Sequence, residues 1–443
     1  MNAVAATSPA LHGPALPPAD PAAPRVLAGW HATGRPAGLS EHLRRYGPPF
    51  AVAHGTGTAM PLMQAVEEAG LTGRGGAGFP TGRKLRAVAA RRGRAVVVVN
   101  AMESEPASRK DQFLLAVAPH LVLDGAVLAA AAVGAAGVHV CLSRTRTIQA
   151  RQMTAALDER RRARLDRVPI HLHTPPHGYV TSESTALVHW LNGGEARPLS
   201  APPRTYEKGV GGRPTLVQNA ETLAHLALIA RYGPAWFRQA GTPDESGTTL
   251  VTVSGAVRFP VVLEVPLGTP LSTLLERAGD PMEPPVAVLL GGYAGTWLPA
   301  GLLSTALARS ALAPLGAAPG AGVVLILPPG ACGLTETARI LAYLAAHSAR
   351  QCGPCLFGLP AVAEDFLLLA EGRADPALVA RLRHRVGLLP DRGACRHPDG
   401  AARLAASALR VFTGDVEHHL AHGPCSAAHR LAVPLASAPK EWR

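Results

Sequence analysis

A chain of 443 residues, 47% of them hydrophobic, is too long for one ordinary core and predicts roughly two to four domains. Its formal net charge of +12 comes almost entirely from arginine, and no nucleic-acid-binding motif accompanies it, so we exclude nucleic acid as a partner. The chain holds no run of about 18 uninterrupted apolar residues, and we therefore expect no direct membrane insertion.

The first half of the chain predicts an α/β domain. Residues 1–44 are rich in Ala and Pro and predict a disordered tail rather than a signal peptide. From 45 to 240, helical and strand patterns alternate, as in a layered α/β fold. The clearest elements are a helical stretch over 40–70, a helix over 80–92, a buried strand over 95–100, a helix from about 111 and a strand over 138–142.

The composition changes near residue 241. Residues 241–330 predict a small β-grasp-like domain with strands at 248–257, 260–265, 286–290 and 322–327 and a helix at 270–278. Residues 331–425 predict a helical domain with helices at 334–349, 357–371, 376–388 and 399–420, separated by turns that carry cysteines. We expect residues 426–443 to form a flexible tail.

A glycine-rich string runs from Gly73 to Lys84 and reads GRGGAGFPTGRK. It contains a G-x-G-x-x-G pattern, but it follows a predicted helix rather than a strand, so the glycines alone are equally typical of an ordinary turn. The string does open a helix. Backbone N–H groups and the helix N-terminus favour a bound phosphate there, and Arg74 and Lys84 are candidates to add full charges.

The whole string resembles the FMN-binding loop of the F-type subunit of NADH:quinone oxidoreductase (respiratory complex I), and of related flavoprotein subunits of NAD-reducing hydrogenases and formate dehydrogenases. Further matches follow in the same order at 100–106, 110–111, 119–120, 179–187, 211–215 and 219–222. The resemblance covers roughly residues 45–425. It implies a Rossmann-like FMN-binding domain, a β-grasp (SLBB-like) module and a C-terminal four-helix iron–sulfur domain.

Carried over by position, the resemblance implies site residues for FMN and for a nicotinamide nucleotide, NAD(H). The FMN phosphate and ribityl region would be held by Gly73, Gly75, Gly76, Gly78 and Lys84, with Arg74 beside them. The isoalloxazine would be lined by Asn100, Glu103, Tyr179, Glu183, Asn219 and Thr222. Glu105 matches a carboxylate near the nicotinamide, and Glu105 and Glu103 are the candidate catalytic residues. Phe79 retains one aromatic ring of the family's adenine site.

Several positions depart from the family's pattern. Met102 replaces an Asp, and Ser182-Glu183-Ser184 replaces Gly-Glu-Glu. In the family, two other aromatic rings sandwich the adenine. Their positions fall near Ala87 and Arg204 here, neither of which is aromatic. The sequence therefore supports FMN binding better than it supports NADH as the electron donor.

The six cysteines are Cys141, Cys332, Cys352, Cys355, Cys395 and Cys425. The resemblance implies a [4Fe–4S] cluster on Cys352, Cys355 and Cys395, with Ala349 at the family's remaining ligand position. We expect Cys425 to be the fourth ligand, with His397 or His422 as alternatives, and Cys141 and Cys332 to be buried in the core. A thioredoxin-type dithiol, a zinc site and a cluster lost in evolution remain alternatives.

The resemblance implies an NADH dehydrogenase-like enzyme that passes electrons from reduced nicotinamide through FMN to the cluster. The acceptor would be a ferredoxin or a thioredoxin-like iron–sulfur subunit, and the arginine-rich surface offers a basic docking face for it. We expect a cytoplasmic location, free or peripheral to a membrane complex. The alternatives are a non-catalytic scaffold and a zinc or dithiol protein that uses Cys352 and Cys355.

Overall fold

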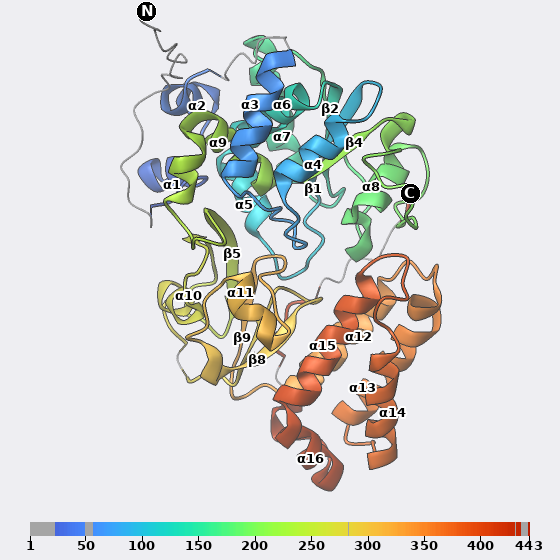
Figure 1. Ribbon diagram of the computed structural model, residues 1–443. Helices are drawn as coiled ribbons and strands as arrows, with labels where there is room; N and C mark the ends of the chain where they lie inside the picture. Colours follow the sequence, from blue (N-terminus) through green and yellow to red (C-terminus); the bar gives the residue numbers. More distant parts are fainter. Residues whose placement is uncertain (1–22, 49–55, 282, 430, 436–441) are drawn as a thin grey trace, which may run out of the picture.

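The computed structural model describes residues 23–48, 56–281, 283–429, 431–435 and 442–443. Figure 1 shows an α/β domain, a smaller β-sheet domain beside it and a C-terminal group of helices. This arrangement confirms the predicted fold class. Within the described residues, no single helix is long and apolar enough to cross a membrane, and the one pair that passes jointly, 110–117 with 119–132, is bent by 96°.

The α/β domain is built on a four-stranded parallel sheet in the order β3-β2-β1-β4. Its strands are β1 (Ala95–Ala101), β2 (Ala135–Leu142), β3 (Ile170–His173) and β4 (Thr215–Asn219). The valine run of β1 is buried because helices cover both faces of the sheet. The chain leaves β1 toward β2 and β3, then returns to the other side of β1 for β4, so the strand order reverses between β1 and β4.

The helices packed around this sheet include α3 (Thr56–Glu68), α4 (Thr81–Ala89), α5 (Lys110–Val117), α6 (Pro119–Ala132), α7 (Thr147–Arg162), α8 (Ser184–Leu191) and α9 (Ala220–Arg238). The predicted helix over 80–92 and the predicted strands over 95–100 and 138–142 are confirmed. Helix α6 packs closely on α9, since a Cβ at Gly125 would lie 1.9 Å from the carbonyl oxygen of Leu223.

The prediction that residues 1–44 are disordered is wrong for the part the structure describes. Residues 1–22 lie outside the described residues, but α1 (Ala28–Thr33) and α2 (Leu39–Tyr46) follow them. Val26 and Leu27 are buried, and the Glu264 carboxylate accepts hydrogen bonds from the N–H groups of residues 25–27. Composition alone did not reveal this anchor because its acceptor lies more than 230 residues away.

The β-grasp domain is a five-stranded sheet in the order β6-β5-β9-β7-β8. It contains β5 (Thr248–Gly255), β6 (Val261–Pro266), β7 (Ala287–Leu290), β8 (Thr296–Pro299), β9 (Val323–Leu327), α10 (Leu271–Arg277) and α11 (Arg309–Leu312). The four predicted strands and the predicted helix are all present. Strand β8 was missed because it has only four residues and lies directly after a glycine-rich turn.

The helical domain contains α12 (Gly333–Ala346), α13 (Leu359–Ala370), α14 (Pro376–Gly387), α15 (His397–Val411) and α16 (Thr413–His422). The fourth predicted helix is divided at Phe412, whose backbone is not helical. The predicted flexible tail also packs in part. Val433 is buried, and the carbonyl of Trp442 accepts a hydrogen bond from the Ala196 N–H in the α/β domain.

One buried carboxylate fastens the α/β helices to one another. Asp124 on α6 accepts hydrogen bonds from His42 at 2.9 Å, from Arg160 at 2.8 Å and from Arg231. Burial opposes its ionisation, but His42 and the two arginines lower its pKa to about 2.

We expect Asp124→Ala to destabilise the chain by about 3–5 kcal/mol, because it removes the carboxylate bound to the buried Arg231 and one of the two carboxylates bound to the buried Arg160. Asp158→Ala removes an exposed partner of Arg161 on α7 and is the matched control, with an expected cost below about 1 kcal/mol. Urea unfolding followed by circular dichroism measures both. Equal midpoints for the two variants would contradict this account of the core.

Candidate functional site

The predicted site residues meet at the carboxyl ends of β1 and β4. Asn100 and Asn219 are neighbours in the register of these two strands. Since the strand order reverses between them, a crevice for a ligand is expected at this edge of the sheet. The segments that follow, 101–106 and 220–222, begin at this edge, and the glycine-rich loop joins them there.

The loop from Gly73 to Phe79 is closed by a hydrogen bond from the Gly73 N–H to the Phe79 carbonyl, 2.9 Å long. Gly76 and Gly78 have φ values of +108° and +62°, which L side chains rarely adopt. A Cβ at Gly75 would lie 3.4 Å from the Cβ of Asn219. The loop therefore presents bare backbone to the end of β4, as close approach to a phosphate requires.

Lys84 reaches the same edge from the first turns of α4. Its ammonium donates a hydrogen bond to the carbonyl oxygen of Val217 on β4. Burial lowers its pKa to about 8, while the nearby Glu183 carboxylate partly opposes that shift. A half-buried cation that donates to a neutral carbonyl suits an anionic ligand, and the FMN phosphate fits this position.

The predicted isoalloxazine-side residues come together through two chain segments. The Asn100 side-chain amide donates to the carbonyl of Ser182 at 2.8 Å, and the Ser104 hydroxyl donates to the carbonyl of Tyr179 at 2.7 Å. Glu183 caps the N-terminus of α8. The segment 179–183 is therefore docked against the segment 100–104, as the matched motifs predict.

Glu105 is buried between the segment 179–183 and the turn that carries Tyr293. Its carboxylate accepts hydrogen bonds from the Tyr179 hydroxyl at 3.0 Å, the Tyr293 N–H at 2.9 Å and the Ala107 N–H at 3.3 Å. Burial nevertheless raises its pKa to about 7. Tyr293 belongs to the β-grasp domain, and no local signal in the sequence marked it.

Three predicted site residues have structural partners. Glu103 accepts hydrogen bonds from the backbone N–H groups of Asp111 and Gln112 and so caps α5. The Arg74 guanidinium is buried against Thr72 and the Ser246 carbonyl, so the prediction that it adds charge for a phosphate is wrong. The Thr222 hydroxyl accepts a hydrogen bond from the Arg74 N–H and thereby holds the loop.

Phe79 and Arg309 lie at the outer face of the loop. The Phe79 ring is 53% exposed, which suits stacking on a ligand, and the Arg83 guanidinium lies 5.9 Å from its centroid. Arg309 of the β-grasp domain donates a hydrogen bond to the Gly76 carbonyl at 3.1 Å, and its guanidinium occupies the space that a Cβ at Gly78 would need. Sequence reasoning missed Arg309, because it contacts the loop across 233 residues of chain.

Cys352, Cys355 and Cys395 gather at the junction of the helical and α/β domains. Burial raises the pKa of the Cys355 thiol, and the neighbouring Cys352 and Cys395 raise it further. Burial, together with the nearby Glu183 carboxylate, raises the pKa of Cys395 to about 11. Since Glu183 belongs to the flavin-side segment, the cysteine turn lies beside the predicted FMN site.

These three thiols are not arranged as a compact site for a single ion. Among the described residues, they do not form a group whose ligand atoms all lie within 4.8 Å of one another. A tetrahedral zinc ion with bonds of about 2.3 Å needs sulfurs about 3.8 Å apart. The C-x-x-C follows helix α12 rather than a strand, unlike the thioredoxin motif.

The prediction that Cys425 completes this ligand set is wrong. Cys425 lies with Cys332 and His419 at the N-terminal end of α12, whereas Cys352 follows its C-terminal end. The 14 residues of α12 separate these ends by about 20 Å. Cys332 is buried as predicted, and so is Cys141. The position of Cys425 depends on how α16 packs, which its local sequence does not specify.

His397 remains as the alternative fourth ligand. Its Nε2 lies 2.9 Å from the carbonyl oxygen of Leu344, and its buried Nδ1 has no hydrogen-bond partner in the described part of the chain. This is the arrangement in which metal-ligating histidines are usually held, with one nitrogen on a carbonyl and the other free.

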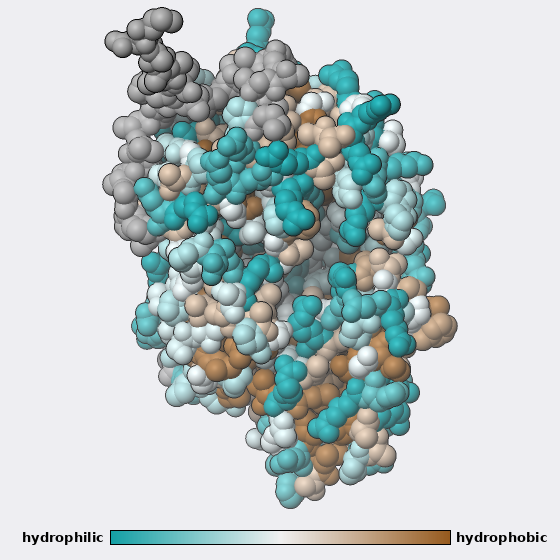
Figure 2. Space-filling view, viewed as in Figure 1, coloured by the Kyte–Doolittle hydropathy of each residue, from teal (hydrophilic) through white to brown (hydrophobic). Residues whose placement is uncertain are grey.

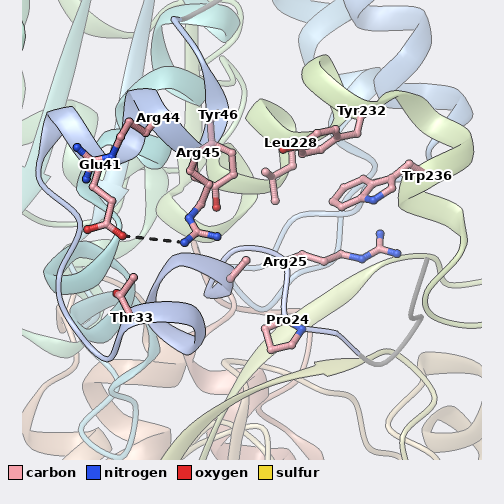
Figure 3. Close-up of a pocket in the computed structure, with 11 residues that line it drawn as sticks. Pro24, Arg25, Thr33, Glu41, Arg44, Arg45, Tyr46, Leu228, Tyr232 and Trp236 are labelled. Carbon is pink, nitrogen blue, oxygen red and sulfur yellow. Dashed lines mark ion pairs between the residues drawn. The ribbon is translucent and has the colours of Figure 1, made fainter. Parts of the chain in front are cut away.

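A cavity of about 610 Å³ lies at the other end of α9, lined by three arginines and three aromatic rings (Figure 3). The lining includes Arg25, Arg44, Arg45, Tyr46, Tyr232 and Trp236. Figure 3 shows Arg25 beside Trp236, and its guanidinium lies 4.2 Å from the ring centroid. The sequence predicted no site here. Residues 1–22 and 49–55, which adjoin the lining residues in the chain, lie outside the described residues.

Comparison with known proteins agrees with this geometry. The family described as Nuo51 FMN-binding domain matches residues 66–228, the SLBB domain matches 250–291, and the NADH-ubiquinone oxidoreductase-F iron-sulfur binding region matches 335–419. The F 2 subunit of NADH-quinone oxidoreductase in Rhizobium meliloti is 30% identical over 386 residues, which cover 84% of this chain and 92% of that protein. The corresponding F protein of Rickettsia typhi is 29% identical, over 81% of this chain and 89% of its own length.

Solved structures extend the comparison to the fold. The NAD+-reducing [NiFe]-hydrogenase in its H2-reduced state superposes with a TM-score of 0.77 at 31% identity, covering 87% of this chain and 68% of that chain. Its air-oxidised state gives a TM-score of 0.75 at 31% identity, with coverages of 87% and 67%. The resemblance inferred from the motifs is confirmed.

The raised pKa of Glu105 predicts a pH-dependent stability. The folded chain binds this proton more tightly than the unfolded chain, so the stabilisation is complete below about pH 4.5 and is lost as the pH rises through about 7. The loss should total about 3 kcal/mol. Glu105→Gln, which cannot ionise, should flatten this part of the profile in urea unfolding between pH 4.5 and 8. Parallel profiles for the two proteins would contradict the assignment.

Proposed function

The chain belongs to the family of NADH-quinone oxidoreductase F subunits, and we propose that it is an electron-transfer flavoprotein subunit that oxidises a reduced nicotinamide nucleotide. The observation that carries this proposal is the convergence of four separate segments at the reversal of strand order: the glycine loop, the end of β1, the segment 179–183 and the end of β4. The cysteine turn lies directly beside them.

Bound FMN would supply the conversion between the hydride of a nicotinamide, which carries two electrons, and the single electrons that an iron–sulfur centre accepts. The residues of this chain would hold and orient the FMN. The backbone of Gly73, Gly75, Gly76 and Gly78 would face the phosphate, with Lys84 as the cation. Asn100, Tyr179, Glu183 and Asn219 would line the ring, while Glu103 and Thr222 hold the segments that carry them.

Glu105 and Phe79 would act on the nicotinamide nucleotide. Glu105 is the carboxylate next to the nicotinamide in this proposal, and its pKa near 7 lets it hold or release a proton at neutral pH. The exposed Phe79 would stack on the adenine. Met102, which is buried here, and Ala87 and Arg204 alter the rest of the pocket, so both NADH and NADPH are tested as donors.

The cluster would be held by Cys352, Cys355 and Cys395, with His397 Nδ1 as the fourth ligand in place of the family's cysteine at Ala349. A bound [4Fe–4S] cluster would accept single electrons and pass them on. The chain brings its ligand turn against the flavin-side segment through Glu183 and through Tyr179, whose ring centroid lies 5.5 Å from that of His397.

Electrons would leave through a partner that docks on the helical domain, either a ferredoxin or a thioredoxin-like iron–sulfur subunit. Figure 2 shows apolar residues gathered on this domain. Leu356 and Phe357 follow Cys355 directly and are 39% and 70% exposed, and Leu367 and Leu388 are exposed as well. We place the activity in the cytoplasm, free or at the periphery of a membrane complex.

An anaerobic titration tests the proposal directly. The FMN-supplied, iron–sulfur-reconstituted chain is mixed with NADH and then NADPH while flavin absorbance is followed. We expect one of them to bleach the flavin. A flavin that neither nucleotide bleaches would refute nicotinamide as the donor, and a chain that takes up no flavin would favour the non-catalytic scaffold.

Lys84→Met should weaken FMN binding by roughly 10- to 100-fold, because it removes the half-buried charge that would face the phosphate. Arg83→Met is the matched control, since Arg83 directly precedes Lys84 on the same helix but is exposed. Fluorescence titration with FMN measures both. Equal affinities in the two variants would show that the phosphate lies elsewhere.

Cys395→Ser should lower the iron and acid-labile sulfide bound per reconstituted chain, whereas Cys141→Ser, at the buried thiol of β2, should leave both unchanged. Elemental analysis with a sulfide assay measures this. Unchanged iron in Cys395→Ser would remove this residue from the ligand set.

A further inference from the structure

A second group of candidate metal ligands lies at the far end of the helical domain. Cys332, His419 and Cys425 offer ligand atoms that all lie within 4.8 Å of one another, and they are the only such group among the described residues. Cys332 caps the N-terminus of α12, His419 lies on α16 and Cys425 follows α16. Cys332 and His419 are 2% and 1% exposed, whereas Cys425 is half-buried.

The chain is folded back to form this group. Gly423 ends α16 with a φ of +83°, a conformation that glycine adopts readily and that reverses the chain direction. The turn packs closely on the turn after α13, because a Cβ at Gly372 would lie 2.6 Å from the Cα of Gly423. Cys425 is thereby brought onto His419, and its N–H donates to His419 Nε2 at 3.2 Å.

The imidazole of His419 is held as metal-ligating histidines are. Its Nδ1 lies 3.2 Å from the carbonyl oxygen of Leu369 and acts as the donor there, so Nε2 carries the lone pair. The same Nε2 lies 3.6 Å from Cys332 Sγ. Zinc bonds of about 2.3 Å to sulfur and about 2.05 Å to nitrogen, at a tetrahedral angle, place these two atoms about 3.6 Å apart.

We propose that Cys332, His419 and Cys425 bind a single zinc ion, with water as the fourth ligand on the half-buried Cys425 side. Coordination would release the two thiol protons to solvent. The bond from the zinc ion to His419 Nε2 would replace the hydrogen bond that the Cys425 N–H donates to this nitrogen. Two thiolates neutralise Zn²⁺, so the complex carries no net charge into the apolar interior. Thiolate and imidazole ligands favour Zn²⁺ over Mg²⁺ or Ca²⁺, which prefer oxygen.

The ion would fasten three helices and the C-terminal segment together. Cys332 begins α12, His419 is hydrogen-bonded to the end of α13, and the chain after Cys425 runs back along α12, where the Ala432 N–H donates to Glu336. This site is separate from the cysteines assigned to the cluster, which lie at the opposite end of α12. The inference therefore does not depend on the proposed redox function.

Metal analysis of the full chain tests the proposal, using the iron–sulfur-reconstituted protein titrated with Zn²⁺. We expect one equivalent of Zn²⁺ to bind. We also expect each cysteine substitution to lower either the bound zinc or the bound iron, but not both. Cys425→Ser should weaken zinc binding by more than about 100-fold, since loss of an outer-shell partner alone costs 10- to 100-fold, and it should keep its iron. Cys352→Ser should lose iron and keep zinc. Zinc that is lost in Cys352→Ser and kept in Cys425→Ser would overturn the proposal.

A second measurement on the unmodified chain needs no variant to fold. Alkylation with iodoacetamide, mapped peptide by peptide, should show that Zn²⁺ protects Cys332 and Cys425. The spectrum of Co²⁺ added in place of zinc should show thiolate-to-cobalt charge transfer. An absence of zinc-dependent protection at these residues would overturn the proposal, as would a Cys332–Cys425 disulfide in the protein as purified.

Discussion

The site depends on one buried carboxylate, that of Glu221. It accepts hydrogen bonds from Lys110 at 2.7 Å, from the Leu250 N–H at 2.8 Å and from the Thr249 hydroxyl at 3.1 Å. Burial opposes its ionisation, but Lys110 and the neighbouring cations lower its pKa to about 2. A charge in this setting is stable only with all its partners in place, so β5 of the β-grasp domain, α5 and α9 must meet here.

That constraint fixes the geometry of the crevice. Glu221 lies two residues after Asn219, Lys110 begins α5, and the Arg74 side chain that faces Glu221 comes from the glycine loop. The loop, the end of β4 and the helix that Glu103 caps are thus positioned by the same ion cluster. Arg74, which the sequence offered as a phosphate ligand, serves instead to hold the loop whose backbone faces the phosphate position.

The proposed flavin and cluster sites are adjacent because the helical domain packs on the segment 179–183. Glu105, Tyr179 and His397 form a continuous buried path from the crevice to the cysteine turn, by a hydrogen bond of 3.0 Å and a ring contact of 5.5 Å. Tyr293 joins this path from the β-grasp domain. All three domains therefore contribute to the surroundings of Glu105, and this enclosure is what raises its pKa.

The sequence by itself determined the elements and the motifs, because both are local. The valine run of β1, the glycine loop before α4 and the helices of the C-terminal domain follow from periodicity and turn chemistry over a few residues. The matched motifs also identified Lys84, Asn100, Glu105 and Tyr179, which the structure brings to one crevice. Short elements without a distinct pattern, such as β8, were not found.

Only the tertiary structure decided which polar groups are paired. It pairs the Arg74 side chain in the core, places Cys425 at the opposite end of α12 from Cys352, and binds the backbone of residues 25–27 to Glu264. It also supplied Arg309 and Tyr293 to the site from a separate domain. In each case the partner lies far along the chain, and the cost of burying an unpaired charge or amide, rather than any local preference, selects the contact.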